Sequence, residues 1–213
     1  MKIPKCVIFD FNGVIVINDR KRLQNLNRIV KKYGIKIPPI QPKDFIGKRV
    51  AETLEQYTNG NPKYFHKIAE EMRVFERGKI LEYPMVRGIK GLLKFLKKNN
   101  VRIYLSTTSV RPTVEKFLKH KGILSYFDFM ITGSEFPMPK DEKFFCAILD
   151  RFGIKPKDAV VIEDSIKGIE AAKKAGCVAF GLTTYLNKKD LKISNEVFKD
   201  HAEIKKFLDR IIM

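Results

Sequence analysis

The chain has 213 residues, of which 44% are hydrophobic, so it is long and apolar enough to fold as a globular protein with a large core. Its formal net charge of +18 favours anionic partners, but no zinc finger or aromatic-basic RNA-binding motif is present, so we do not expect nucleic-acid recognition. No apolar run reaches the roughly 18 residues that a membrane helix needs. Three scattered cysteines predict reduced thiols in a cytoplasmic protein.

Short apolar runs along the chain predict five strands, at Lys5–Phe9, Arg102–Ser106, Phe127–Thr132, Ala159–Ile162 and Val178–Leu182. Helical patterns lie between and after the later strands, at Pro112–Lys121, Asp141–Phe152, Ser165–Ala175 and Ala202–Ile212. This alternation predicts an α/β fold with a Rossmann-like parallel sheet, against which the C-terminal helix packs.

Residues 18–84 differ from the rest of the chain because they contain no convincing strand. Apolar residues recur at helical spacing from Leu23 to Tyr33, and Gly34 then ends this helix. Further helices are expected at Ala51–Tyr57 and Pro62–Arg77. We therefore expect a core domain of residues 1–17 and 85–213, with residues 18–84 inserted as a helical cap that excludes water and selects substrates.

Carboxylates end two of the predicted strands. Asp10 follows the run Cys6–Phe9, and Glu163 and Asp164 follow the run Ala159–Ile162. If these strands are neighbours in a parallel sheet, Asp10 and Asp164 face each other across a pocket at the carboxyl ends of the strands. Carboxylates held so close repel each other unless a hard cation lies between them, which predicts a magnesium site beside a carboxylate nucleophile.

Three segments together resemble the haloacid dehalogenase superfamily of phosphotransferases. They are residues 9–14 (FDFNGV), 105–109 (LSTTS) and 161–176 (VIEDSIKGIEAAKKAG), and their order and spacing carry the resemblance. The last segment is similar to the branch that contains β-phosphoglucomutase and phosphoglycolate phosphatase, whose helical cap lies where the insertion lies here. The resemblance covers nearly the whole chain.

This resemblance implies that Asp10 attacks phosphorus and forms an aspartyl-phosphate, which divides one difficult displacement into two easier ones. It implies that Mg²⁺ is held by the Asp10 carboxylate, the backbone carbonyl of Asn12 and Asp164, with Glu163 as a further or alternative ligand. The expected activity is the hydrolysis of a small phosphorylated metabolite, by a monomer or a homodimer.

Phosphate-binding residues are also implied by the resemblance. Thr107 would donate its hydroxyl to the transferring phosphoryl group, although a threonine here also fits a turn or a helix cap. Thr108 and Ser109 would bind substrate beside it. The lysine that the family places near the phosphoryl group corresponds best to Lys140, with Lys143 as the alternative.

Asn12 departs from the family pattern, in which a second aspartate protonates the leaving oxygen and later activates water. An amide cannot transfer these protons, and general acid–base catalysis contributes about 10²–10⁴-fold to rates. Four interpretations remain open. The protein is a weak or specialised phosphatase, it is a binding protein that keeps the old pocket, Asn12 is an engineered change, or Asn12 deamidates to aspartate.

The cap contains candidate specificity residues. Lys48 and Arg49 follow Gly47 where relatives carry a specificity loop, and their cations could bind a substrate phosphate or carboxylate. Arg22 stands where the phosphomutases carry a cap histidine, which argues against mutase chemistry. The chain's own histidines are expected in polar surroundings, as neither ligands nor bases. A phosphatase for RNA or DNA ends remains an alternative that only the charge suggests, and it predicts binding that weakens strongly with salt.

Overall fold

A six-stranded parallel sheet forms the centre of the molecule. The computed structural model describes residues 3–58, 63–135 and 141–212. The strand order is β3-β2-β1-β4-β5-β6, so β1 lies between β2 and β4. The strands are β1 (Cys6–Phe9), β2 (Arg102–Ser106), β3 (Phe129–Ile131), β4 (Ala159–Glu163), β5 (Val178–Leu182) and β6 (Glu196–Phe198).

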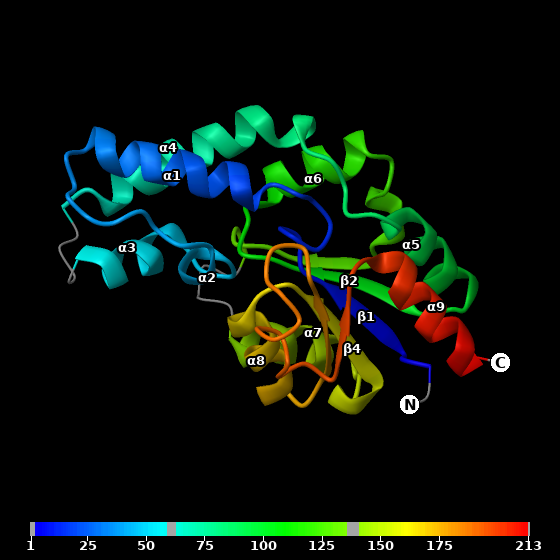
Figure 1. Cartoon of the computed structure of the whole chain (residues 1–213). Helices are drawn as coiled ribbons and strands as arrows, with labels where there is room; N and C mark the ends of the chain where they lie inside the picture. Colours follow the sequence, from blue (N-terminus) through cyan, green and yellow to red (C-terminus); the bar gives the residue numbers. More distant parts are fainter. Residues whose placement is uncertain (1–2, 59–62, 136–140, 213) are drawn as a thin grey trace.

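Helices cover both faces of this sheet and form a separate group beyond it (Figure 1). The α-helices are α1 (Asp19–Lys32), α2 (Pro42–Phe45), α3 (Val50–Thr58), α4 (Phe65–Lys79), α5 (Ile89–Lys98), α6 (Arg111–His120), α7 (Glu142–Phe152), α8 (Ile166–Lys174) and α9 (His201–Ile212). Short 3₁₀ turns occur at Ile80–Glu82, Leu124–Tyr126 and Pro156–Asp158. Within the described ranges, no helix is long and apolar enough to cross a membrane.

The two faces of the sheet bury different residues of the same strand, as the two-residue period of a strand requires. Val7 and Phe9 of β1 pack into one core together with side chains of α5, α6 and α9. Cys6 and Ile8 point to the other face and pack with side chains of α7 and α8. Because both faces are covered, β1 is apolar throughout, which is typical of a central parallel strand.

The segment between β1 and α5 has a hydrophobic core of its own. Leu26, Phe45, Leu54 and Met72, from α1, α2, α3 and α4, are buried together in it. Figure 1 shows α1, α3 and α4 gathered at the end of the molecule opposite the two termini. The two segments that connect these helices to the sheet region lie side by side, because the Ile17 N–H donates a hydrogen bond to the Pro84 carbonyl at 2.9 Å. The domain boundaries at 17/18 and 84/85 remain a prediction.

The predicted α/β class with a parallel sheet is confirmed, and the five predicted strands are present with ends that shift by at most two residues. Two α-helices and one strand were not predicted: α2, α5 and β6. The residues of β6 do not form an apolar run, so the sequence has no hydrophobic pattern that predicts this edge strand. By contrast, α5 buries Leu92, Leu93 and Leu96 at helical spacing, so its signal was present and was overlooked. The predicted start of α4, Pro62, lies outside the described residues.

Candidate active site

Three carboxylates meet at the carboxyl ends of the two central strands. Asp10 follows β1, Glu163 ends β4 and Asp164 follows it. The strands β1 and β4 pair directly, which is the condition under which the sequence analysis expects these carboxylates to meet. One oxygen of each carboxylate lies within 4.8 Å of the other two. Glu163 and Asp164 are buried and Asp10 is half-buried. An all-oxygen, anionic donor set of this kind fits a hard divalent cation such as Mg²⁺.

Glycines allow the backbone to approach these carboxylates closely. Gly13 has a φ of +72°, and a Cβ built on it would lie 1.8 Å from Asp164 Oδ2. A Cβ on Gly168, in the first turn of α8, would lie 2.3 Å from Glu163 Oε1. The turn after β1 and the start of α8 therefore pack against the acidic cluster from two sides, which only residues without a side chain permit.

Ser165 links Glu163 to helix α8, a role that the sequence analysis missed. Its hydroxyl accepts a hydrogen bond from the Gly168 N–H at 3.0 Å and donates to Glu163 Oε2 at 2.9 Å. The signal for it was a serine directly before an apolar helical pattern, which is typical of an N-cap. The same residue therefore caps α8 and fixes the orientation of one carboxylate of the cluster.

Both ends of the Asn12 amide are hydrogen-bonded. Asn12 Nδ2 donates to Ser109 Oγ at 3.0 Å, and Asn12 Oδ1 accepts from Asn18 Nδ2 at 2.8 Å. Asn18 is buried and lies just before α1, so the side chain of residue 12 connects the loop after β2 to the start of α1. A hydroxyl and an amide N–H₂ can both donate to a carboxylate, so the surroundings of residue 12 would also satisfy an aspartate.

Two adjoining cavities lie between the strand ends and the helical segment. The first, which we call the inner cavity, has a volume of about 30 Å³ and contains the acidic cluster. The described residues that line it are Asp10, Asn12, Asp19, Arg22, Gly47, Lys48, Thr108, Glu163, Asp164 and Ser165. The second, which we call the outer pocket, has a volume of about 430 Å³ and shares Arg22, Lys48 and Thr108 with the first.

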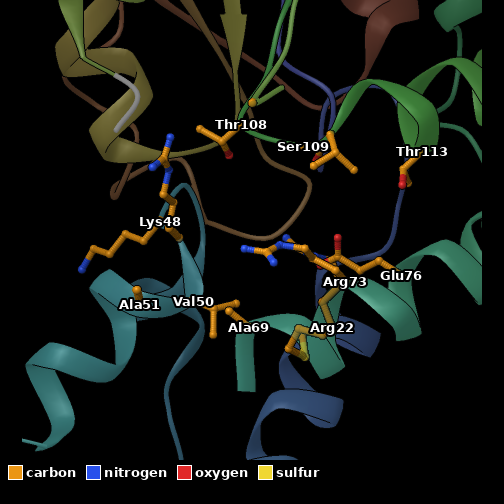
Figure 2. Close-up of a pocket in the computed structure, with 14 residues that line it drawn as sticks. Arg22, Lys48, Val50, Ala51, Ala69, Arg73, Glu76, Thr108, Ser109 and Thr113 are labelled. Carbon is orange, nitrogen blue, oxygen red and sulfur yellow. The ribbon is translucent and has the colours of Figure 1, made fainter. Parts of the chain in front are cut away.

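The outer pocket is lined from two sides. Figure 2 shows Thr108, Ser109 and Thr113 from the loop after β2 and from α6 on one side, with Val50, Ala51 and Ala69 from α3 and α4 on the other. The lining also contains four cationic residues and one acidic residue: Arg22, Lys48, Arg49, Arg73 and Glu76. The excess of positive charge suits an anionic ligand.

Arg22 lies between two carboxylates where the cavities meet. Its Nε donates to Glu76 Oε1 at 2.5 Å, and its Nη1 binds Asp19. Burial raises the pKa of Asp19, and the neighbouring Arg22 opposes this shift. Burial would lower the pKa of Arg22, but Glu76 and Asp19 outweigh it and raise this pKa, so Arg22 remains a cation. The sequence analysis missed Asp19 and Glu76, although the spacing of Asp19 and Arg22 on one helix face was a usable signal.

The predicted phosphate-binding residues have different surroundings. Thr108 lines both cavities and Ser109 lines the outer pocket. Thr107 is buried, its Oγ1 accepts a hydrogen bond from the Ser109 N–H at 3.1 Å, and it is not among the described residues that line either cavity. Lys140 lies outside the described residues, and Lys143 is exposed on α7. The roles of these residues therefore remain predictions.

The loop before α3 brings the predicted specificity residues to the cavities. Lys48 lines both of them, and Arg49 lines the outer pocket. Gly47 adopts a φ of +76°, and a Cβ there would lie 2.4 Å from Ser165 Oγ, so this loop touches the start of α8. Behind the loop, Lys167 of α8 forms an ion pair with Glu52 of α3.

His201 corrects the expectation that all histidines lie in polar surroundings. Its side chain is fully buried, and its Nε2 is 2.6 Å from the carbonyl oxygen of Val14, so the ring donates to the turn after β1. Burial lowers the pKa of His201 to about 4, against the opposing effects of Val14 and Asp200. His201 is thus a neutral residue at neutral pH that ties the start of α9 to the loop carrying Asn12 and Gly13.

Comparison with known proteins agrees with this arrangement. A phosphorylated-carbohydrate phosphatase of Thermotoga maritima is 25% identical over 179 residues, which cover 81% of this chain and 82% of the relative. A phosphoglycolate phosphatase of Vibrio vulnificus is 24% identical, with 84% and 83% covered. The relatives are thus phosphatases by name, in line with the predicted enzyme class of phosphoric monoester hydrolases.

Solved structures show the same fold. The β-phosphoglucomutase of Clostridium difficile superimposes with a TM-score of 0.80 at 25% identity, covering 98% of this chain and 99% of that one. A hydrolase of Pseudomonas syringae gives a TM-score of 0.86 at 18% identity, with 97% and 98% covered. The family model of the haloacid dehalogenase-like hydrolases matches residues 7–182. The chain therefore belongs to the haloacid dehalogenase-like hydrolase family.

Proposed function

We propose that this chain is a Mg²⁺-dependent phosphatase that cleaves a small phosphorylated metabolite through an aspartyl-phosphate on Asp10. The observation that supports this most directly is the meeting of three carboxylates, Asp10, Glu163 and Asp164, within 4.8 Å at the inner end of a cationic pocket. The names of the curated relatives, which include phosphatases of phosphorylated carbohydrates and of phosphoglycolate, support a small phosphorylated substrate.

The residues that would hold Mg²⁺ are Asp10, Asp164 and the backbone carbonyl of Asn12, with Glu163 as a further or alternative ligand. The all-oxygen donor set fits this ion. When bound, Mg²⁺ offsets the negative charge of the phosphate and of the carboxylates around it. Because the ligand from residue 12 is a main-chain atom, the amide side chain of Asn12 does not weaken this set.

The other roles are nucleophilic attack, binding of the phosphoryl oxygens and binding of the rest of the substrate, and we assign each to particular side chains. One oxygen of Asp10 attacks phosphorus, while Thr107, Thr108 and Lys140 would bind the phosphoryl oxygens, as the family resemblance implies. Lys48 and Arg49 would bind anionic groups of the substrate from the cap side. We further propose that residues 18–84 act as a cap over a core of residues 1–17 and 85–213, which excludes water from the nucleophile.

The amide at residue 12 favours one second candidate. A protein that has lost the acid–base residue can still bind a phosphorylated ligand in the same pocket, and Asn12 has both its amide groups engaged in hydrogen bonds. Such a binding protein would keep the metal site and the cationic pocket but would release no phosphate.

Phosphate release decides between these candidates. We would measure it with Mg²⁺ on p-nitrophenyl phosphate and small phosphomonoesters, for the natural chain, Asp10→Asn and Asn12→Asp. An enzyme releases phosphate unless Asp10 is replaced. If release appears only in Asn12→Asp, the binding-protein candidate is correct; if Asp10→Asn keeps full activity, the proposed chemistry is wrong.

A further inference from the structure

We propose that the phosphoryl donors of this chain are small phosphoric anhydrides, such as acyl phosphates, whose leaving group departs as a stable anion. This inference rests on the proposed function and names its substrate class. It starts from the question of which group lining the inner cavity can protonate a leaving oxygen.

Residue 12 cannot donate this proton. Its amide carries no acidic hydrogen, and its two polar groups are already bonded to Ser109 Oγ and Asn18 Nδ2. An amide fixed between two partners acts here as a structural link. A substrate whose leaving group needs a proton therefore gains nothing from this position.

Most of the other described groups that line the inner cavity are carboxylates and cations, and the carboxylates take part in metal binding or ion pairing instead of proton transfer to a leaving group. Asp10, Glu163 and Asp164 form the proposed metal cluster. Asp19, a further carboxylate in this lining, is ion-paired with Arg22 on the adjacent turn of α1, and this cation opposes the rise in the pKa of Asp19 that burial causes. This pairing uses the Asp19 carboxylate to hold a cation in place.

Cations occupy the side from which a leaving group would exit. Arg22 and Lys48 line both the inner cavity and the outer pocket, so any group that passes from the acidic cluster into the outer pocket meets them. Glu76 and Asp19 raise the pKa of Arg22, so this residue keeps its proton and assists little as an acid, and cations at this position act through their charge. They stabilise negative charge that develops on the leaving oxygen, and this assistance is largest when the leaving group departs as an anion.

The chemistry of an anhydride matches these residues at the step that phosphorylates Asp10. An oxygen of Asp10 forms a bond to phosphorus, the bond from phosphorus to the bridging oxygen breaks, and its electron pair leaves with a carboxylate or phosphate anion. Water then attacks the aspartyl-phosphate, the bond from phosphorus to Asp10 breaks as the carboxylate departs, and one proton of the water passes to the released phosphate. This second step is slow, because residue 12 has no carboxylate to activate the water. Neither departure needs an acid, whereas an alkyl ester must expel a strongly basic alkoxide.

The outer pocket also limits the size of the leaving group. Its volume of about 430 Å³ is at the small end for ligand pockets. Its apolar wall of Val50, Ala51 and Met72 lies beside the cations Arg49 and Arg73. A short acyl group, or a small anion, fits this combination of a modest apolar surface and an excess of positive charge.

The dependence of rate on the leaving group tests this inference. We would measure kcat/KM with Mg²⁺ for acetyl phosphate, pyrophosphate, p-nitrophenyl phosphate, phenyl phosphate and ethyl phosphate, in the natural chain and in Asn12→Asp. The natural chain should cleave acetyl phosphate well and ethyl phosphate very poorly. Asn12→Asp should recover about 10²–10⁴-fold on ethyl phosphate, with a much smaller change on acetyl phosphate.

A second pair of variants tests the role assigned to the cation. Arg22→Gln should lower kcat/KM for acetyl phosphate, while Arg20→Gln, an exposed arginine on the same helix, should not. Comparable rates on acetyl and ethyl phosphate in the natural chain would overturn the inference and leave the phosphatase in place. Absence of phosphate release from every compound, in the natural chain and in Asn12→Asp alike, would instead overturn the proposed function itself.

Discussion

At the scale of single residues, the acidic cluster depends on positions where a side chain cannot be accommodated. Gly13 is the clearest case, because its left-handed backbone and its distance from Asp164 both exclude a Cβ. Gly34 provides a matched comparison: its φ of +67° is similar, but a Cβ there would meet no atom within 4 Å. A substitution at Gly34 would therefore introduce backbone strain alone, whereas a substitution at Gly13 would introduce the same strain and a steric conflict with Asp164.

We expect Gly13→Ala to destroy the site and Gly34→Ala to leave it intact. Both variants incur about 1–2 kcal/mol for a left-handed non-glycine residue, but only Gly13→Ala forces the Asp164 carboxylate to move. Mg²⁺ affinity measured by calorimetry should fall in Gly13→Ala and stay unchanged in Gly34→Ala. Equal Mg²⁺ affinities in the two variants would show that the contact with Asp164 has no role in binding.

The chemical stability of Asn12 is also decided at this scale. An asparagine before glycine deamidates when the following backbone nitrogen attacks its side-chain carbonyl. Here the Gly13 N–H donates to the Val16 carbonyl at 2.8 Å, and the side-chain carbonyl of Asn12 accepts a hydrogen bond from Asn18 Nδ2. Both reacting groups are held in other bonds.

Asn12 should therefore deamidate more slowly in the folded protein than in the protein unfolded in urea. Peptide mass analysis over days at pH 8 measures both rates on the same sequence, so the unfolded chain is its own control. Equal rates would mean that the fold gives no protection, and natural conversion to aspartate would become a realistic source of activity.

At the scale of elements, α9 stabilises the loop after β1 through His201. The full burial of the ring favours a neutral imidazole, and this effect outweighs the hydrogen bond from Nε2 to Val14, which favours the charged form. Burial lowers the pKa of His201 to about 4 from an unfolded value near 6.5, so the unfolded chain binds the extra proton first. The contribution of His201 to stability is complete above pH 6.5 and is lost as the pH falls from 6.5 to 4.

Between pH 7 and pH 5, this residue should reduce the free energy of unfolding by about 2 kcal/mol. His201→Gln keeps an N–H donor but does not titrate, so it should lack this component of the pH dependence. Urea unfolding of both proteins at pH 7 and pH 5 measures the difference. Parallel losses of stability in the two proteins would contradict the assignment.

At the scale of the whole molecule, elements with a strong hydrophobic period could be predicted from the sequence. The strand of Cys6–Phe9 and the helix that buries Leu26 and Ile29 are examples, because their apolar spacing reflects the face they bury. The sequence also predicted that Asp10 and Asp164 face each other if their strands are neighbours, since parallel strands place their carboxyl ends at one edge.

Contacts between distant segments could not be predicted in this way. The bond from Asn12 to Ser109 spans 97 residues, and that from His201 to Val14 spans 187. The pair of Arg22 and Glu76 depends on how α1 packs against α4. No local pattern encodes such contacts, because they exist only once the elements have packed together.

The central claim is that Asp10 becomes phosphorylated, and Asn12 makes this claim accessible to a direct measurement. An amide cannot activate water, so the aspartyl-phosphate should break down slowly and accumulate during turnover. We would mix the protein with Mg²⁺ and acetyl phosphate, quench it in acid and map the peptides by mass spectrometry. The account predicts a phosphoryl group on Asp10 that hydroxylamine removes and that Asp10→Asn does not acquire. Phosphate release that continues in Asp10→Asn, with no adduct on this residue in the natural chain, would contradict it.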